Sequence, residues 1–249
     1  DAHDFTQLMC SVLKDKFNNI HTICLTDDEV SIEALGRVSS FMRRSNREDV
    51  VMFYYAGHGL LDQQLDYYLS THKTNFLEPS QNSILFDKIE DCFDGIKALN
   101  RCCFIDACHS GEIDKDDLLA ESQSIIPEGK ITFRNASSKQ FVSKHDVRHI
   151  NLLLDDLFID TRWGIGAIIV SSSGGLEASI EGDKWKNGLF TWCLRKGLTD
   201  PNADSNKNGT LTMSELTEYL KSEVFRLSGG KQCPTLRSGR SNMSNFIIR

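Results

Sequence analysis

The stretch FIDACHSG, residues 104–111, joins a short apolar run to a series of small and reactive side chains. In α/β proteins, a buried strand that ends in this way carries its last residues to the rim of the sheet, where ligands bind. Cys108 lies at that end. The stretch therefore predicts a sheet whose edge presents a reactive thiol.

A second strand ends in the same manner. The stretch EDVVMFYYAGHG, residues 48–59, contains six consecutive apolar residues followed by Ala56 and then by Gly57, His58 and Gly59. A run of this kind predicts a strand that is buried on both faces. Because the carboxyl ends of parallel strands lie at one edge of the sheet, we expect His58 and Cys108 to lie close together.

A neighbouring histidine is what a catalytic cysteine needs. A thiol with an ordinary pKa of about 8.5 is mostly protonated at pH 7, and an imidazole can accept its proton. Acyl transfer also needs donors for the oxyanion. The backbone N–H groups of Cys108 and Gly59 are candidates, since a glycine lets a carbonyl approach the chain closely. His109 is poorly placed to reach back to the thiol, so we expect it to be structural.

Strand and helix patterns alternate along the chain, which predicts βαβ units and a mainly parallel α/β sheet. Apolar runs predict strands at 22–27, 50–55, 65–71, 101–107, 165–173 and 244–249. Periodicity predicts helices at 1–17, 31–44, 84–99, 188–198 and 212–227. Asp27 and Asp28 are candidate caps of the second helix. Residues 112–163 are more polar, with a helical piece at 152–158, and are predicted to be an insertion.

Composition and charge narrow the classes of protein. The 249 residues suffice for one substantial domain, 1–249. A net charge of −7 without a basic run argues against nucleic acid or an anionic membrane as a partner. No stretch resembles a membrane span or a signal core, and the eight cysteines form no CxxC pair. A cytoplasmic location with reduced, mostly buried thiols is expected.

The motifs resemble those of the caspase-like cysteine peptidases, which include the metacaspases and their bacterial relatives. The resemblance rests on FYYAGHG, on FIDACHSG and on the later stretches SSSGGLEAS and NGLFTWCL. It implies the three-layer αβα caspase–haemoglobinase fold and a regulated effector endopeptidase that acts on proteins or peptides. By resemblance His58 is the base, Cys108 is the nucleophile, and Gly59 with Cys108 donates to the oxyanion. No cofactor is required for the chemistry.

Asp106 lies two residues before the candidate nucleophile, where caspases have glutamine. The resemblance to metacaspases implies that this aspartate lines the first specificity pocket and selects arginine or lysine. A partly buried carboxylate does favour a cation that offsets its desolvation. The alternative is that Asp106 accepts hydrogen bonds from neighbouring backbone N–H groups and never meets substrate. Asp62 and Glu177 follow other strands and are further candidates for shaping the pocket.

The stretch DSNKNGTLTMSE, residues 204–215, matches a calcium-binding EF-hand loop. Asp204, Asn206, Asn208 and Glu215 are its candidate ligands, with calcium as an activator. The alternative is a glycine-bearing turn with an acidic cap on the next helix. By resemblance, a second candidate calcium site is the acidic run after the nucleophile, which consists of Glu112, Asp114, Asp116 and Asp117.

Two departures from the family pattern bear on regulation. The strand that usually precedes the first helix is missing, so an upstream segment, a regulatory domain or a partner is expected to supply it. The insertion at 112–163 contains several lysines and arginines, and it either holds an autocleavage site or covers the cleft. Two rival functions are a non-catalytic caspase-like adaptor and a calcium-binding regulatory module centred on residues 204–215.

Overall fold

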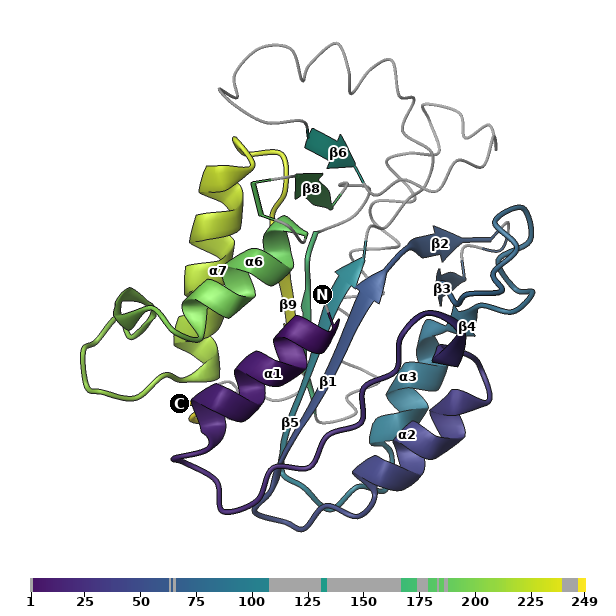
Figure 1. The fold of residues 1–249 in the computed structure, drawn as a ribbon. Helices are drawn as coiled ribbons and strands as arrows, with labels where there is room; N and C mark the ends of the chain where they lie inside the picture. The colour runs from purple at the N-terminus through teal and green to yellow at the C-terminus, as the bar shows by residue number, and fades with distance from the viewer. Residues whose placement is uncertain are drawn as a thin grey trace.

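A four-stranded sheet runs through the centre of the structure in the order β1-β5-β7-β9 (Figure 1). β1 (Val50–Gly57), β5 (Asn100–Ala107) and β7 (Ile168–Ser171) are parallel, and β9 (Thr235–Ser238) pairs antiparallel with β7. The predicted, mainly parallel α/β sheet is confirmed. The computed structural model of the chain describes residues 2–62, 64, 66–107, 131–133, 167–173, 179–182, 184–185, 188–238 and 246–249.

Helices cover both faces of this sheet and complete the predicted three layers. α1 (Ala2–Leu13), α6 (Leu189–Gly197) and α7 (Met213–Leu227) pack on one face, and α2 (Ala34–Met42) and α3 (Phe86–Phe93) pack on the other (Figure 1). Each helix buries an apolar stripe against the strands. Of the helices that the structure describes, none has the length and apolar character of a membrane span.

The side chains of β5 show why both faces need helices. Cys102 and Phe104 lie in the core cluster beneath α1, α6 and α7, whereas Cys103 and Ile105 lie in the cluster beneath α2 and α3. Successive side chains of a strand point to opposite faces, and all four are at most 2% exposed. Full burial of a large apolar side chain contributes about 1.5–3 kcal/mol, so β5 is anchored from both sides.

Two smaller antiparallel sheets accompany the central one. β2 (Gly59–Leu61), β3 (Tyr67–Leu69) and β4 (Ile84–Leu85) form the first, and β6 (Ile131–Phe133) and β8 (Ile180–Gly182) form the second. One residue separates the end of β1 from the start of β2. The first small sheet therefore continues directly from the carboxyl edge of the central sheet (Figure 1).

The strand predicted at 22–27 is wrong, and the described part of the strand predicted at 244–249 makes only a bridge. No described strand pairs with residues 22–27, which lead into the 3-10 helix η1 (Asp27–Glu29). At the C-terminus, the described residues 246–249 make one isolated bridge, between Ile247 and Thr212. Residues 22–27 have the apolar pattern but no described strand beside them, whereas residues 246–249 exchange backbone hydrogen bonds with residues 211–213 over that single bridge.

Some helix boundaries also differ from prediction. Asp27 and Asp28 belong to η1 and do not cap α2, whose first N–H, on Ala34, donates to the Ser31 side-chain oxygen at 3.2 Å. The helix predicted at 84–99 covers only 86–93, because its first two residues form β4 and Gly95, with a φ of +72°, follows its end. The helical piece predicted at 152–158 lies outside the described residues.

A slot beside β1 explains why residues 22–27 are not a strand. It has a volume of about 850 Å³ and lies between residues 18–25 and β1, with side chains of α1 and α2 also lining it. Strands pair at a spacing of about 4.8 Å, and the slot keeps the two backbones apart. β1 is the outermost strand of the described sheet on this side.

One side chain holds the connection from α3 into β5. The Arg101 guanidinium donates to the carbonyl oxygens of Phe93 at 3.3 Å, Ile96 at 2.7 Å and Ala98 at 2.6 Å. These carbonyls follow the end of α3, where helical partners run out, and bonds from a charged donor are the strong ones. Arg101 therefore fixes where β5 begins.

Replacing Arg101 with methionine keeps much of the apolar stem but removes the three hydrogen bonds. We expect the free energy of unfolding to fall by about 2–4 kcal/mol, because the carbonyls lose their donor. The same change at Arg47, which is exposed, is the matched control and should cost less than about 0.5 kcal/mol. Urea unfolding followed by circular dichroism measures both variants, and equal losses would contradict the assignment.

Candidate active site

The two motif strands are neighbours in the sheet. β1 pairs in parallel with β5 over eight residues, from Val50 opposite Asn100 to Gly57 opposite Ala107. His58 follows the last pair on the β1 side. Cys108 is the next residue of the sequence after Ala107, and it lies outside the described residues. His58 and Cys108 are therefore each the next residue in sequence after the same paired position, Gly57 opposite Ala107.

His58 forms the junction between β1 and β2, and both polar groups of its main chain are bonded. Its N–H donates to Ser70 Oγ at 3.2 Å, and its carbonyl accepts from the Ser70 N–H at 2.9 Å and from the Tyr55 hydroxyl at 3.2 Å. The half-buried imidazole lies edge-to-face against Phe76, with 5.7 Å between ring centroids. The histidine is thus presented at the carboxyl edge on a restrained backbone.

The two glycines beside His58 differ in their surroundings. At Gly57 a Cβ would lie 2.3 Å from the hydroxyl oxygen of Tyr55, so packing requires glycine there. Gly59 is buried and opens β2 opposite Leu69 of β3. The role of Gly59 as an oxyanion donor stays a prediction.

Asp106 is fully buried near the end of β5 and bonds to the first turn of α6. Its Oδ2 accepts from Thr191 Oγ1 at 2.5 Å and from the Thr191 N–H at 3.3 Å, and the Tyr54 hydroxyl lies 2.6 Å from the same Oγ1. A helix N-terminus favours a carboxylate. These are bonds of the kind that the structural alternative for Asp106 predicts, and its contact with a substrate cation stays a prediction.

Sequence reasoning missed the partners of both candidate residues. Ser70 lies 12 positions from His58, and Thr191 lies 85 positions from Asp106. A hydroxyl residue in an apolar run carries no sign of such a distant partner. The position of Tyr55 could have been anticipated from the local sequence. Tyr55 and Gly57 lie on the same face of one strand, and a glycine two residues after a tyrosine leaves room for the tyrosine ring to lie along the strand.

A sequence profile of the caspase domain matches residues 2–243. The chain belongs to the caspase family. The crystal structure of a protein from Geobacter sulfurreducens superposes with a TM-score of 0.59 at 13% identity, covering 96% of this chain and 85% of that chain. At this identity the likeness concerns the fold alone. No curated protein matches the chain significantly in sequence.

Four other cysteines of this caspase-family chain are poor rivals to Cys108. Cys92, Cys102, Cys103 and Cys193 are buried. Desolvation raises the pKa of each of these thiols, and it raises the pKa of Cys193 to about 12. They therefore stay protonated and unreactive at neutral pH. The prediction of buried structural thiols is confirmed for these four residues.

A second cysteine and histidine pair is present in the described structure. Cys24 Sγ is 3.7 Å from Nδ1 of His3 on α1; His3 is exposed and Cys24 is half-buried. The sequence motifs do not point to this pair. A thiol reagent could therefore modify Cys24 as well as Cys108, and a measurement of thiol reactivity on this caspase-family chain has to distinguish the two residues.

The predicted calcium loop of this chain is a turn closed by its own backbone. Asp204 accepts from the N–H groups of Asn208 at 3.2 Å and Gly209 at 2.8 Å, and Asn206 Oδ1 accepts from the Asn208 N–H at 3.0 Å. Gly209 has a φ of +85°, which glycine adopts at little cost. Within the described ranges no three His, Cys, Asp or Glu side chains are grouped for a metal ion. Calcium binding stays a prediction.

Glu215, the last candidate ligand, caps α7. Its Oε2 accepts from the N–H and the hydroxyl of Thr212 at 3.1 and 2.8 Å, and its Oε1 lies 3.4 Å from the Asn206 N–H. The Glu215 N–H donates back to Thr212 Oγ1, which completes a capping box. The bond from the Thr212 backbone is the main cause that lowers the pKa of the Glu215 carboxyl.

Of the remaining acidic candidates, only Asp62 lies among the described residues. Asp62 Oδ1 accepts from the N–H groups of Gln64 and Asp66, so this carboxylate shapes the turn between β2 and β3. Several candidates lie outside the described residues, namely Glu112, Asp114, Asp116, Asp117, Glu177 and the insertion at 112–163 apart from 131–133.

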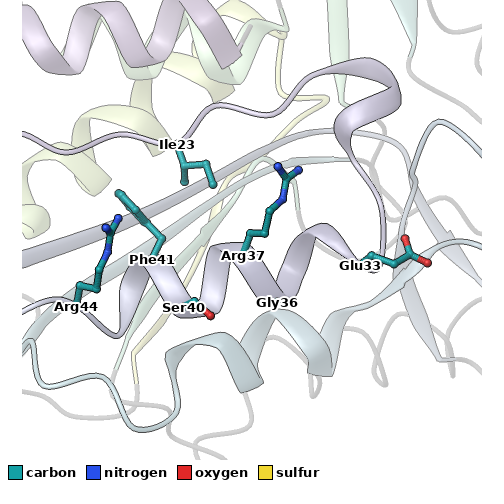
Figure 2. A pocket seen from close by; sticks show the side chains of 7 residues that line it. All are labelled: Ile23, Glu33, Gly36, Arg37, Ser40, Phe41 and Arg44. Atoms are coloured by element: carbon teal, nitrogen blue, oxygen red, sulfur yellow. The ribbon is translucent and has the colours of Figure 1, made fainter.

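An open depression over α2 is separate from the candidate residues. Its volume is about 640 Å³, and Figure 2 shows the side chains that line it: Ile23, Glu33, Gly36, Arg37, Ser40, Phe41 and Arg44. The guanidinium of Arg44 lies 5.1 Å from the centroid of the Phe41 ring. No candidate catalytic residue lines this depression.

Thr191→Val tests whether the hydroxyl of Thr191 stabilises the buried Asp106. The change keeps the branched shape, and we expect the free energy of unfolding to fall by about 2–3 kcal/mol because a charge-assisted bond is lost in the core. Thr191→Ser keeps the hydroxyl and is the matched control, with an expected loss of about 1 kcal/mol. Denaturant unfolding measures both, and a serine variant as unstable as the valine variant would contradict this role.

Glu215→Gln tests the acidic cap of α7 through its pH dependence. Because the folded pKa lies below the ordinary value of about 4.3, the carboxylate contributes its full stability above that value and loses it as pH falls through the folded pKa. At pH 7 we expect the variant to be about 1 kcal/mol less stable, with the difference shrinking below about pH 4. Glu218→Gln, at an exposed position of α7, is the control. A loss independent of pH would count against the capping role.

Proposed function

We propose that this caspase-family chain is a cysteine endopeptidase that uses His58 and Cys108 to hydrolyse peptide bonds in protein or peptide substrates. The observation that carries the proposal is the β1–β5 register, which ends with Gly57 opposite Ala107. The next residue in sequence after each strand is one of the two candidate catalytic residues. The family match over residues 2–243 supports the same class of chemistry.

The proposed reaction needs only groups of the chain and water. His58 accepts the proton of the Cys108 thiol, and the thiolate attacks the peptide carbonyl carbon to form a carbon–sulfur bond. Backbone N–H groups of Gly59 and Cys108 stabilise the oxyanion. When the carbon–nitrogen bond breaks, the imidazolium gives its proton to the leaving amine. Water, deprotonated by His58, then attacks the thioester carbon; the carbon–sulfur bond breaks, the acid is released, and the Cys108 thiolate recovers the proton from the imidazolium.

For specificity we propose that Asp106 selects substrates with arginine or lysine before the cut. Asp106 lies two residues before Cys108 and is fully buried. Thr191 supplies hydrogen bonds to Oδ2 of Asp106, and a substrate cation would supply the opposite charge that a buried carboxylate favours. The two functions are compatible, since a carboxylate can accept several bonds.

Two parts of regulation are also proposed. An additional strand, from an upstream segment or a partner, would pair with β1 in the slot of about 850 Å³. Calcium held by Asp204, Asn206, Asn208 and Glu215 would act as an activator. The rival functions, an adaptor or a calcium-binding module, would leave Cys108 without a chemical role.

The first test is the hydrolysis of fluorogenic peptides that differ only in the residue before the cut: arginine, lysine, aspartate or leucine. We expect cleavage after arginine and lysine, with kcat/KM reduced at least about a hundredfold by Cys108→Ala and by His58→Ala. The assay is run with calcium and with a chelator, since activity only with calcium would support the activator site. Incubation of the active chain also shows by gel whether the insertion at 112–163 is cut.

Asp106→Asn separates specificity from catalysis in the same assay. The asparagine retains much of the shape but not the charge, so cleavage after arginine should fall far more than cleavage after leucine. Equal losses on all four peptides would assign Asp106 to structure alone. Calcium binding by a chain that cleaves none of the peptides would favour the regulatory module.

A further inference from the structure

Tyr55 extends along β1 from the core to the carboxyl edge. It is packed against the apolar cluster beneath α2 and α3. The side chain crosses over Gly57, where a Cβ would lie 2.3 Å from its hydroxyl oxygen. The hydroxyl lies 2.9 Å from the Ser70 carbonyl, 3.1 Å from Ser70 Oγ and 3.2 Å from the His58 carbonyl. The Tyr55 ring thus packs in the core while its hydroxyl reaches the main chain of His58.

Ser70 bonds both sides of the His58 main chain. Its N–H donates to the His58 carbonyl at 2.9 Å, and its Oγ accepts from the His58 N–H at 3.2 Å. One proton arrangement satisfies the group: the His58 N–H donates to Ser70 Oγ, the Ser70 O–H donates to the Tyr55 oxygen, and the Tyr55 O–H is shared between the Ser70 carbonyl at 2.9 Å and the His58 carbonyl at 3.2 Å. Each hydroxyl then donates its one hydrogen and accepts once, and such chains strengthen their members.

The local sequence explains why an external clamp is needed here. His58 stands between Gly57 and Gly59, and glycine is the residue with the most backbone freedom to lose. A histidine at such a junction does not hold its direction by backbone preference alone. The bonds from Tyr55 and Ser70 replace that missing restraint.

We infer that Tyr55 and Ser70 are positioning residues that hold the imidazole of His58 in line with the Cys108 thiol. The inference rests on the proposed function, in which His58 is the general base. Hydrogen bonds join Tyr55 and Ser70 to each other and to the main chain of His58, so no chemical step is assigned to them. Their effect is through geometry, and a displacement of about 1 Å at a reacting group can cost about a hundredfold in rate.

Single hydroxyl deletions test this inference. Tyr55→Phe and Ser70→Ala each remove one hydroxyl, whereas Ser70→Thr retains it. Tyr219→Phe is the matched control, because the hydroxyl of Tyr219 donates to Asp200 at 3.3 Å on the α7 side of the molecule, away from His58. Circular dichroism and melting curves first confirm that each variant is folded. If Tyr55→Phe does not fold, the comparison of Ser70→Ala with Ser70→Thr decides.

Two measurements are made on each variant. The first is kcat and KM on the cleaved peptide, where we expect kcat to fall about tenfold to a hundredfold with KM changed less than about twofold. The second is the pH dependence of Cys108 alkylation by iodoacetamide, resolved from Cys24 by peptide mapping. We expect the midpoint for Tyr55→Phe and Ser70→Ala to move toward that of His58→Ala. Ser70→Thr and Tyr219→Phe should retain the native profile.

The outcomes separate this inference from the proposed function. Folded Tyr55→Phe and Ser70→Ala variants with native kcat and a native alkylation profile would overturn the inference while the peptidase function stands. If the native chain cleaves no peptide, the proposed function fails, and the alkylation profiles alone decide the positioning roles. A His58→Ala profile identical to the native one would overturn both roles, since His58 would then not act on Cys108.

Discussion

The parallel pairing of β1 with β5 is the constraint on which every candidate residue depends. It sets Gly57 opposite Ala107, so that His58 and Cys108 are each the next residue in sequence after the same paired position. A slip of one residue would turn every side chain of a strand to the other face. β5 resists such a slip because Phe104 and Ile105 are buried in opposite core clusters. Packing deep in the sheet therefore determines geometry at its edge.

Two consecutive tyrosines carry this constraint to the polar groups of the edge. Tyr54 points into the cluster beneath α1, α6 and α7, and its hydroxyl bonds to Thr191, which in turn bonds to Asp106. Tyr55 points to the other face and bonds to Ser70 and His58. Because neighbouring residues of a strand face opposite ways, one dipeptide supports both candidate groups. The rings of Tyr54 and Tyr55 pack against the two core clusters, so the core holds both hydroxyl groups in place.

The parallel sheet was predictable, because apolar runs followed by glycine and reactive residues identify buried strands such as β1 and β5. The prediction at 22–27 failed because no described strand lies beside these residues, whereas the described residues 246–249 do meet a partner at 211–213 but form only one bridge with it. A strand is a property of a pair, and an apolar run forms one only where a partner backbone lies beside it. The supports of the candidate site were unpredictable for a related reason, since Thr191 meets Asp106 across 85 positions of sequence.

A segment bound in the slot beside β1 would affect both tyrosines. Tyr54 and Tyr55 both line the slot, and β1 is the outer strand of the described sheet there. An extended segment paired with β1 would restrict the backbone from which both tyrosines project. It would therefore act on the Asp106 group and on the His58 group together, although it would touch neither. Because Tyr54 and Tyr55 project from opposite faces of β1, a segment that restrains the β1 backbone would restrain the support of both candidate residues, Asp106 and His58.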